Sequence, residues 1–219
     1  MANVNHFKEV VSGPWTSTAQ TDYRVQVTHL TANPFVGSSY EPKGTIHVTG
    51  QGSQSKDKGK DWRDDFDFRI RQPAEQWFSD NKEIKIHAGF LRQYKNVRNI
   101  LMDLVCQYPD YKIRVDGYSL GASWTQLFVQ DVLYRYPYRD IQAVLYEPGN
   151  PWRKLPKLYK ILLKKHVTFV RSIWDPVTWM RLLGFFRYGK TITIGKWWRI
   201  WPCQHLEDQV IRNLEEKFK

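Results

Sequence analysis

The chain has 219 residues, of which 42% are hydrophobic and 25% charged, so it can bury one core and is not expected to be disordered. Its formal net charge of +11 favours acidic partners such as nucleic acid, anionic lipid or an anionic substrate. No run resembles a secretory signal or a membrane span, and Cys106 and Cys203 match no metal-binding or disulfide pattern. We therefore expect a reduced, cytoplasmic protein with a single domain over residues 1–219.

In chain order, the first expected elements are strands, and helices alternate with strands only in the second half. The expected strands are Tyr23–Leu30, Thr45–Thr49, Ile84–His87, Ile113–Val115, Ile141–Tyr146 and Val167–Ile173, and the expected helices are Phe90–Cys106, Leu120–Tyr136 and Leu206–Phe218. A polar, glycine-containing loop is expected over Gln51–Asp65. This order predicts an α/β fold, with a mostly parallel sheet, an antiparallel N-terminal start and helices on both faces.

One short motif between a strand and a helix indicates catalysis. Residues 113–122 read "IRVDGYSLGA", which places G-x-S-x-G at the turn between the two elements. Such a turn leaves no room for side chains two residues before and after its apex, so glycine fits Gly117 and Gly121. The hydroxyl of Ser119 then lies beside a helix N-terminus, whose amides favour negative charge. The motif predicts that Ser119 is a nucleophile.

A serine nucleophile needs a base, and the α/β-hydrolase chain order places that histidine after the serine and the acid. Only His166 and His205 follow Ser119. His166 lies at the entry of an expected core strand, whereas His205 lies between a loop and the last expected helix. We therefore predict His205 as the base.

The acid that orients the base is expected between Ser119 and His205, where the chain has Asp131, Asp140 and Asp175. Asp131 lies within an expected helix, and Asp140 precedes a strand and therefore lies at the wrong edge of the sheet. Asp175 directly follows an expected strand, so it is the predicted acid. An aspartate before proline also commonly begins a helix.

The oxyanion of an acyl-transfer reaction needs two preset donors. The first expected donor is the backbone N–H of Leu120, the residue after the nucleophile. The second is Ser53 in "GQGS", which follows the strand "TIHVTG". The same four residues could also form an ordinary turn.

These residues together resemble the class 3 lipases, the fungal-lipase-like branch of the α/β-hydrolase fold. The matching stretches are "GQGS", "DWRDDFDF", "IHAGFLRQYKNVRNIL", "GYSLGA", "YEPGNP", "DPVT" and His205, in the family order over about residues 44–208. The resemblance implies a carboxylic-ester hydrolase with Ser119, Asp175 and His205 as its triad, and no metal or organic cofactor.

The sequence also departs from the family pattern. Tyr118 and Gln51 replace a histidine and an arginine, and Trp124 is bulkier than expected, which could narrow the site. The stretch at the family's lid position, Ser53–Asp61, is polar and has no apolar face to open onto an oil droplet. These departures favour partly polar esters over triglycerides.

Trp179–Pro202 interleaves aromatic and basic residues. It could form an acyl-chain pocket whose rim contacts an anionic membrane, or a hairpin with core aromatics and solvated lysines. The basic residues of the first interpretation are Arg181, Arg187, Lys190, Lys196 and Arg199. No nucleic-acid motif is present, so nucleic acid is not the expected partner.

The prediction is thus a serine ester hydrolase of the lipase or esterase type, phospholipase A included, that acts on acyl lipids or partly polar esters. The alternative is a non-catalytic module of the same fold that binds an anionic membrane or a protein partner. Acyl transfer to another alcohol would use the same residues, and the sequence does not give the oligomeric state.

Overall fold

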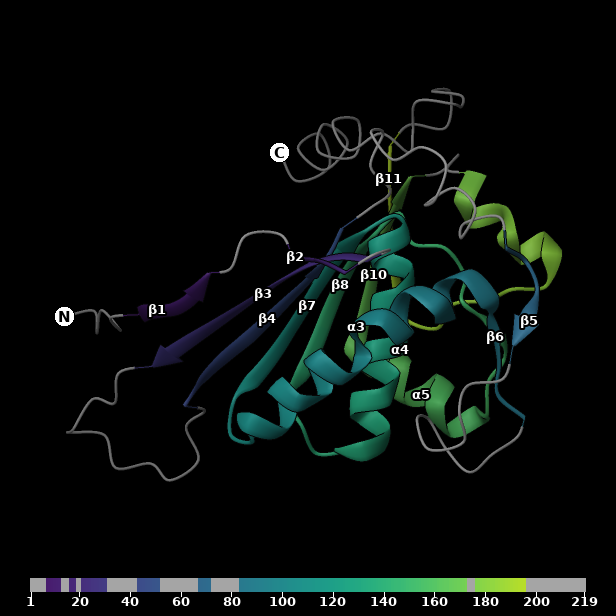
Figure 1. Cartoon of the computed structure of the whole chain (residues 1–219). Coiled ribbons are helices and arrows are strands. Elements are labelled where there is room, and N and C mark those ends of the chain that lie inside the picture. Colours follow the sequence, from purple (N-terminus) through teal and green to yellow (C-terminus); the bar gives the residue numbers. More distant parts are fainter. Residues whose placement is uncertain are drawn as a thin grey trace.

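The computed structural model describes residues 7–12, 16–18, 21–30, 43–51, 67–71, 83–172 and 176–195 (Figure 1). The strands are β1 (Phe7–Ser12), β2 (Thr16–Thr18), β3 (Thr21–Leu30), β4 (Gly44–Gly50), β5 (Ile70–Arg71), β6 (Lys85–His87), β7 (Lys112–Tyr118), β8 (Ile141–Tyr146), β9 (Trp152–Lys154), β10 (Val167–Ser172) and β11 (Lys190–Ile194). The helices are α3 (Ala88–Gln107), α4 (Leu120–Arg135), α5 (Lys157–His166) and the 3-10 helix η2 (Pro176–Leu183).

The main sheet is mixed and has eight strands in the described part of the chain, in the order β1-β3-β4-β7-β8-β10-β11 with β2 paired to β3. Strands β4, β7, β8, β10 and β11 run parallel, while β1, β2 and β4 each pair antiparallel with β3. This confirms the expected α/β fold with an antiparallel N-terminal start. All expected strands and helices within the described residues are present, with ends shifted by a few residues.

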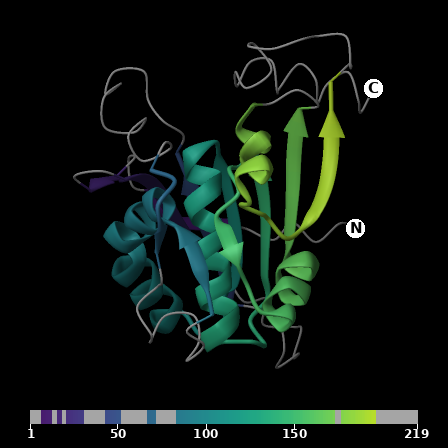
Figure 2. The ribbon, with the colours of Figure 1, turned by 90° about the vertical axis from the view of Figure 1, so that its right-hand side faces the viewer.

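The parallel strands lie side by side in the same order as in the chain, from β4 to β11. Because crossovers between parallel strands are right-handed, this order places α3, α4 and α5 on the same face (Figures 1 and 2). The prediction placed helices on both faces, whereas the helices α3, α4 and α5 of the described residues cover one face; the expected helix Leu206–Phe218 lies outside the described residues. In β4 and β7, every second side chain is buried beneath the helices, as the alternation of a strand predicts.

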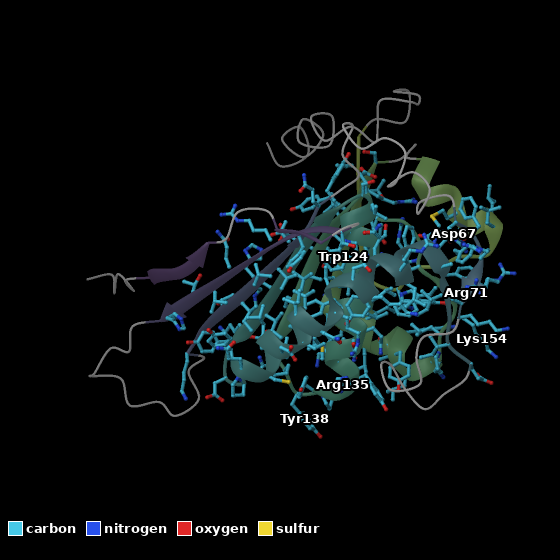
Figure 3. All side chains as sticks on the ribbon, in the orientation of Figure 1. Asp67, Arg71, Trp124, Arg135, Tyr138 and Lys154 are labelled. Carbon is cyan, nitrogen blue, oxygen red and sulfur yellow. The ribbon has the colours of Figure 1, made fainter. Side chains whose placement is uncertain are left out.

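Helix α4 is buried almost all round, because it lies between the sheet and its neighbours α3 and α5. The buried carboxylate of Asp131 is satisfied there by the Tyr94 hydroxyl at 2.7 Å and by the guanidinium groups of Arg98 and Arg135 at 2.6 and 3.1 Å. Burial and the neighbouring Asp131 raise the pKa of Tyr94 well above its ordinary value. Trp124 also lies in this core (Figure 3).

A second, three-stranded antiparallel sheet, in the order β5-β6-β9, flanks the main sheet. Its edge is extended by Phe186, whose N–H and C=O bond to Trp152 at 2.7 and 3.0 Å. Strand β11 pairs in parallel with β10. The hairpin interpretation thus placed a strand at residues 190–194 correctly, and the residues expected to form its other strand lie outside the described residues.

Candidate active site

The predicted nucleophile lies at the apex of a strained turn between β7 and α4. Ser119 has φ 51° and ψ −119°, a left-handed backbone that an L-residue adopts at a cost of about 1–2 kcal/mol. Its N–H donates to the Tyr146 carbonyl at 3.0 Å, and its own carbonyl accepts the Ser123 N–H at 3.0 Å. The turn is therefore fixed on both sides, as the motif predicts.

Both glycines of the motif are required by close contacts. A Cβ on Gly117 would lie 2.9 Å from the amide nitrogen of Ala122, inside the first turn of α4. A Cβ on Gly121 would overlap the carbonyl of Gly50, at the end of β4. The expected steric reason for the two glycines is confirmed, and Gly50 is a third small residue that the same contact needs.

Ser123 connects the nucleophile turn to the loop after β8. Its hydroxyl donates to the Ser119 carbonyl at 2.8 Å and accepts the Gly149 N–H at 2.7 Å. Gln126, one turn further along α4, donates to the Gly149 carbonyl at 3.0 Å. These bonds hold the G-x-S-x-G turn against the adjacent loop independently of any substrate.

The described residues that lead to the two predicted oxyanion donors meet at this point. Leu120 begins α4, where the first backbone N–H groups have no partner within the helix. The contact between Gly50 and Gly121 places the end of β4 and Gln51 beside the start of the same helix. Ser53 lies outside the described residues, so its role as second donor stays a prediction.

Asp175 and His205 also lie outside the described residues, and their roles stay predictions. The strand that leads to Asp175 is β10, which is separated from β7 by β8 alone. Two strand spacings amount to about 10 Å, a span that an imidazole between a serine and a carboxylate can bridge. The described end of β10 is therefore at a suitable place for the acid.

The rejected candidates lie away from the serine. His166 ends α5, and its Nδ1 is 2.8 Å from the carbonyl of Ile141, the first residue of β8, at the opposite edge of the sheet. Asp140 lies at that edge too and forms an ion pair with Arg114. Asp131 is separated from Ser119 by about 18 Å of helix.

Glu147 is a buried carboxylate beside the nucleophile turn that the sequence analysis did not single out. It follows Tyr146, whose carbonyl holds Ser119, and its Oε1 accepts the N–H and the hydroxyl of Ser172 at 2.6 and 2.7 Å. Its backbone has φ 47°, and the residue is 0% exposed. The signal in the sequence was an acidic residue placed directly at the carboxyl end of a core strand.

The histidine of "HAGF" is an aromatic core residue. His87 stacks on Phe90 with 4.1 Å between ring centroids, and Phe68 and Phe185 meet it edge-on at 5.4 and 5.1 Å. Burial lowers the pKa of His87 to about 4, although Asp67 acts in the opposite direction. His87 therefore belongs to the packing that positions α3.

Within the described ranges, no group of three or more His, Cys, Asp or Glu side chains is placed to hold a metal ion. None of the helices described is long and apolar enough to cross a membrane. The thiol of Cys106 is free and exposed, and Cys203 lies outside the described residues.

Comparisons with known proteins identify the family. Residues 47–183 match the class 3 lipase family. The lipase of Rhizomucor miehei is 31% identical over 94 residues, which are 41% of this chain and 26% of that protein. The secreted alkaline triacylglycerol lipase of Penicillium cyclopium is 28% identical over 113 residues, 50% of this chain and 38% of that protein. The chain thus spans well under half of either relative.

Solved structures share the fold. The triacylglyceride lipase of Rhizomucor miehei superposes with a TM-score of 0.60 at 22% identity, covering 87% of this chain and 67% of that one. A fungal lipase in complex with an inhibitor gives a TM-score of 0.62 at 19% identity, covering 94% and 82%. A triacylglycerol lipase whose catalytic centre is a serine protease triad gives 0.61 at 21% identity, covering 87% and 67%.

Proposed function

Because this chain belongs to the class 3 lipase family, we propose that it hydrolyses carboxylic esters through an acyl-enzyme formed on Ser119. The observation that carries the proposal is the backbone of Ser119, which is held in a left-handed conformation between β7 and the N-terminus of α4. A buried strand and helix fix this turn at both ends, and such strain is typical of sites where a side chain must be presented to a substrate.

In the proposed reaction, Ser119 Oγ attacks the ester carbonyl while His205 takes its proton. The N–H of Leu120 and Ser53 stabilise the oxyanion, and Asp175 orients the imidazole and stabilises its cation. His205 then returns the proton to the departing alcohol. A water molecule activated by His205 attacks the acyl-enzyme, and the carboxylic acid leaves. These steps require no metal or organic cofactor.

We infer acyl lipids or partly polar esters as the substrate class. The lipases among the relatives support an acyl lipid. The names that specify a substrate are those of triacylglycerol lipases, so they give phospholipase A activity no support. The polar sequence of Ser53–Asp61 supports esters that are more polar than a triglyceride. The net charge of +11 supports peripheral contact with an anionic membrane.

A fluorophosphonate probe and p-nitrophenyl esters from acetate to palmitate test the proposal. We expect the probe to label the chain once and the Ser119→Ala variant not at all, with ester hydrolysis lost in the same variant. A folded chain that neither reacts with the probe nor hydrolyses any ester would contradict the enzyme proposal and favour the non-catalytic binding module.

A further inference from the structure

Apolar side chains are exposed together on the side of the molecule formed by η2 and the small sheet. Leu182 is 85% exposed, Leu183 52% and Ile70 45%, and Phe68 and Phe186 are each exposed by over a third. Single exposed apolar residues are ordinary, whereas a group of them marks a contact surface. We name this region the η2–β5 face, made by residues 68–71, Lys85, 153–154 and 181–186.

Contacts between segments show that the η2–β5 face is continuous. The Phe68 ring lies 6.4 Å from that of Phe185, and Arg153 Nη1 donates to the Leu183 carbonyl at 2.7 Å. Phe186 extends the small sheet by pairing with Trp152. Figure 2 shows η2, β5, β6 and β9 together on the side turned toward the viewer.

The same face is rich in basic side chains. Its exposed cationic residues are Arg69, Arg71, Lys85, Arg153, Lys154 and Arg181. Figure 3 shows Arg71 and Lys154 at the outer side of the molecule.

Only two described carboxylates lie among these cations. Asp67 is buried and paired with both Arg69 and Arg92, and Glu83 lies 3.4 Å from Lys154. Two guanidinium groups therefore share one carboxylate at Asp67, and the described part of the face keeps a positive balance.

Of the three basic residues suggested from the sequence that the structure describes, two lie away from the η2–β5 face. Of those in the described chain, Arg181 lies on the η2–β5 face. Arg187 is half-buried, with its guanidinium 5.4 Å from the centre of the Phe169 ring and a bond to the Pro148 carbonyl at 3.1 Å. Lys190 begins β11, so it lies at the amino ends of the parallel strands, whereas Ser119 lies at their carboxyl ends. Lys196 and Arg199 lie outside the described residues.

We propose that the η2–β5 face docks on an anionic lipid surface. Exposed aliphatic side chains surrounded by cations suit an interface of acyl chains and negative headgroups. A nucleic acid would meet the cations too, but the most exposed apolar side chains, Leu182, Leu183 and Ile70, are aliphatic. The two aromatic ones, Phe68 and Phe186, are exposed by only about a third, so the face suits acyl chains better than stacked bases. Because η2 begins four residues after the end of β10, docking would bring the carboxyl ends of the parallel strands toward lipid. This reason for docking rests on the proposed ester hydrolysis.

The test is co-sedimentation with vesicles of phosphatidylcholine alone and of phosphatidylcholine mixed with phosphatidylserine. All proteins carry Ser119→Ala so that lipid is not consumed. We expect the parent protein to bind the mixed vesicles in a salt-sensitive manner and to bind pure phosphatidylcholine weakly. Replacing Arg71, Lys85 and Arg181 by Gln should weaken binding to mixed vesicles by roughly 100-fold.

The matched control replaces Lys164, Lys165 and Lys190 by Gln, which removes the same charge from exposed residues at the opposite edge of the sheet. We expect this control to bind within a few-fold of the parent. A third variant, Leu182→Ser with Leu183→Ser, should lose binding at unchanged net charge. An equal loss in the face and control variants would overturn the proposal, as would equal binding to both vesicle types or tighter binding to a single-stranded oligonucleotide.

The outcome separates docking from catalysis. Hydrolysis of p-nitrophenyl butyrate is measured with Ser119 intact in the face and control variants, and both should keep the parent rate. Hydrolysis without vesicle binding would contradict the docking proposal and leave the ester-hydrolase proposal intact. Vesicle binding without hydrolysis would support docking and contradict the ester-hydrolase proposal.

Discussion

The bond between Glu147 and Ser172 offers a sharp test of how the edge of the sheet is held. Ser172 ends the described part of β10, three residues before the predicted acid Asp175. Its hydroxyl and N–H both donate to Glu147 Oε1, at 2.7 and 2.6 Å, and both residues are 0% exposed. Glu147 in turn follows Tyr146, whose carbonyl accepts the N–H of Ser119. A Ser172→Ala change removes one of these two bonds without adding volume.

The expected cost follows from the chemistry of that bond. Removing one partner of a buried hydrogen-bonded group costs about 1–3 kcal/mol, and no solvent reaches this carboxyl group to replace the lost bond. We therefore expect Ser172→Ala to lower the free energy of unfolding by about 2 kcal/mol. The loosened end of β10 should also lower kcat for a p-nitrophenyl ester by about tenfold with little change in KM, because the acid loop begins there.

Urea unfolding and steady-state kinetics measure the two effects. Thr168→Ala is the matched control, because Thr168 lies on the same strand, is half-buried and is at the opposite end of β10 from the acid loop. It should cost well under 1 kcal/mol and leave kcat unchanged. If Ser172→Ala is no more destabilising than Thr168→Ala, the bond to Glu147 does not hold this edge. If stability falls but kcat does not, the end of β10 does not position the acid.

Other predictions concern the triad, the "HAGF" histidine and the second motif glycine. Ser119→Ala and His205→Ala should each abolish esterase activity and be strongly non-additive, whereas His166→Ala should keep most activity; the reverse result for the histidines would refute the base assignment. Burial lowers the pKa of His87 to about 4, below its unfolded value, so the unfolded chain binds a proton first and stability falls as pH drops below about 6.5. Between pH 7 and about pH 4.5, unfolding measurements should show a loss about 2–3 kcal/mol larger in the wild type than in His87→Phe. Gly121→Ala should destabilise by about 3 kcal/mol because its Cβ would overlap the end of β4; a stable, active variant would show that this contact can relax.

The elements with clear periodicity could be predicted from the sequence, and the short ones could not. The β-rich composition of Ile141–Tyr146 predicted β8, and apolar residues at helical spacing predicted that α4 begins at Leu120. The two- and three-residue strands β5 and β9 are too short to show a period. For Lys190–Ile194 the alternation indicates a strand but not its partner, because a parallel neighbour and a hairpin neighbour require the same pattern.

In the candidate site, too, the features within one short segment could be predicted and the contacts between distant segments could not. The nucleophile turn is local, since Gly117, Ser119 and Gly121 lie within five residues and their steric reason is contained in the motif. The buried bond between Glu147 and Ser172 joins residues 25 positions apart, and only the order of the strands brings them together. No periodicity or motif in either segment indicates the other.

The topology explains why a carboxylate at the end of β8 is useful. The predicted nucleophile follows β7 and the predicted acid follows β10, so one strand lies between them and must fix their spacing. The end of β8 contacts both sides: the Tyr146 carbonyl accepts the Ser119 N–H, the Glu147 N–H donates to the Val170 carbonyl, and the Glu147 side chain binds Ser172. The left-handed backbone of Glu147 is unfavourable for a side-chain-bearing residue, and a glycine would adopt it freely. A glycine would keep the backbone bond to Val170 but lose both bonds to Ser172, so the strain at Glu147 is offset by the two bonds that its carboxyl group accepts.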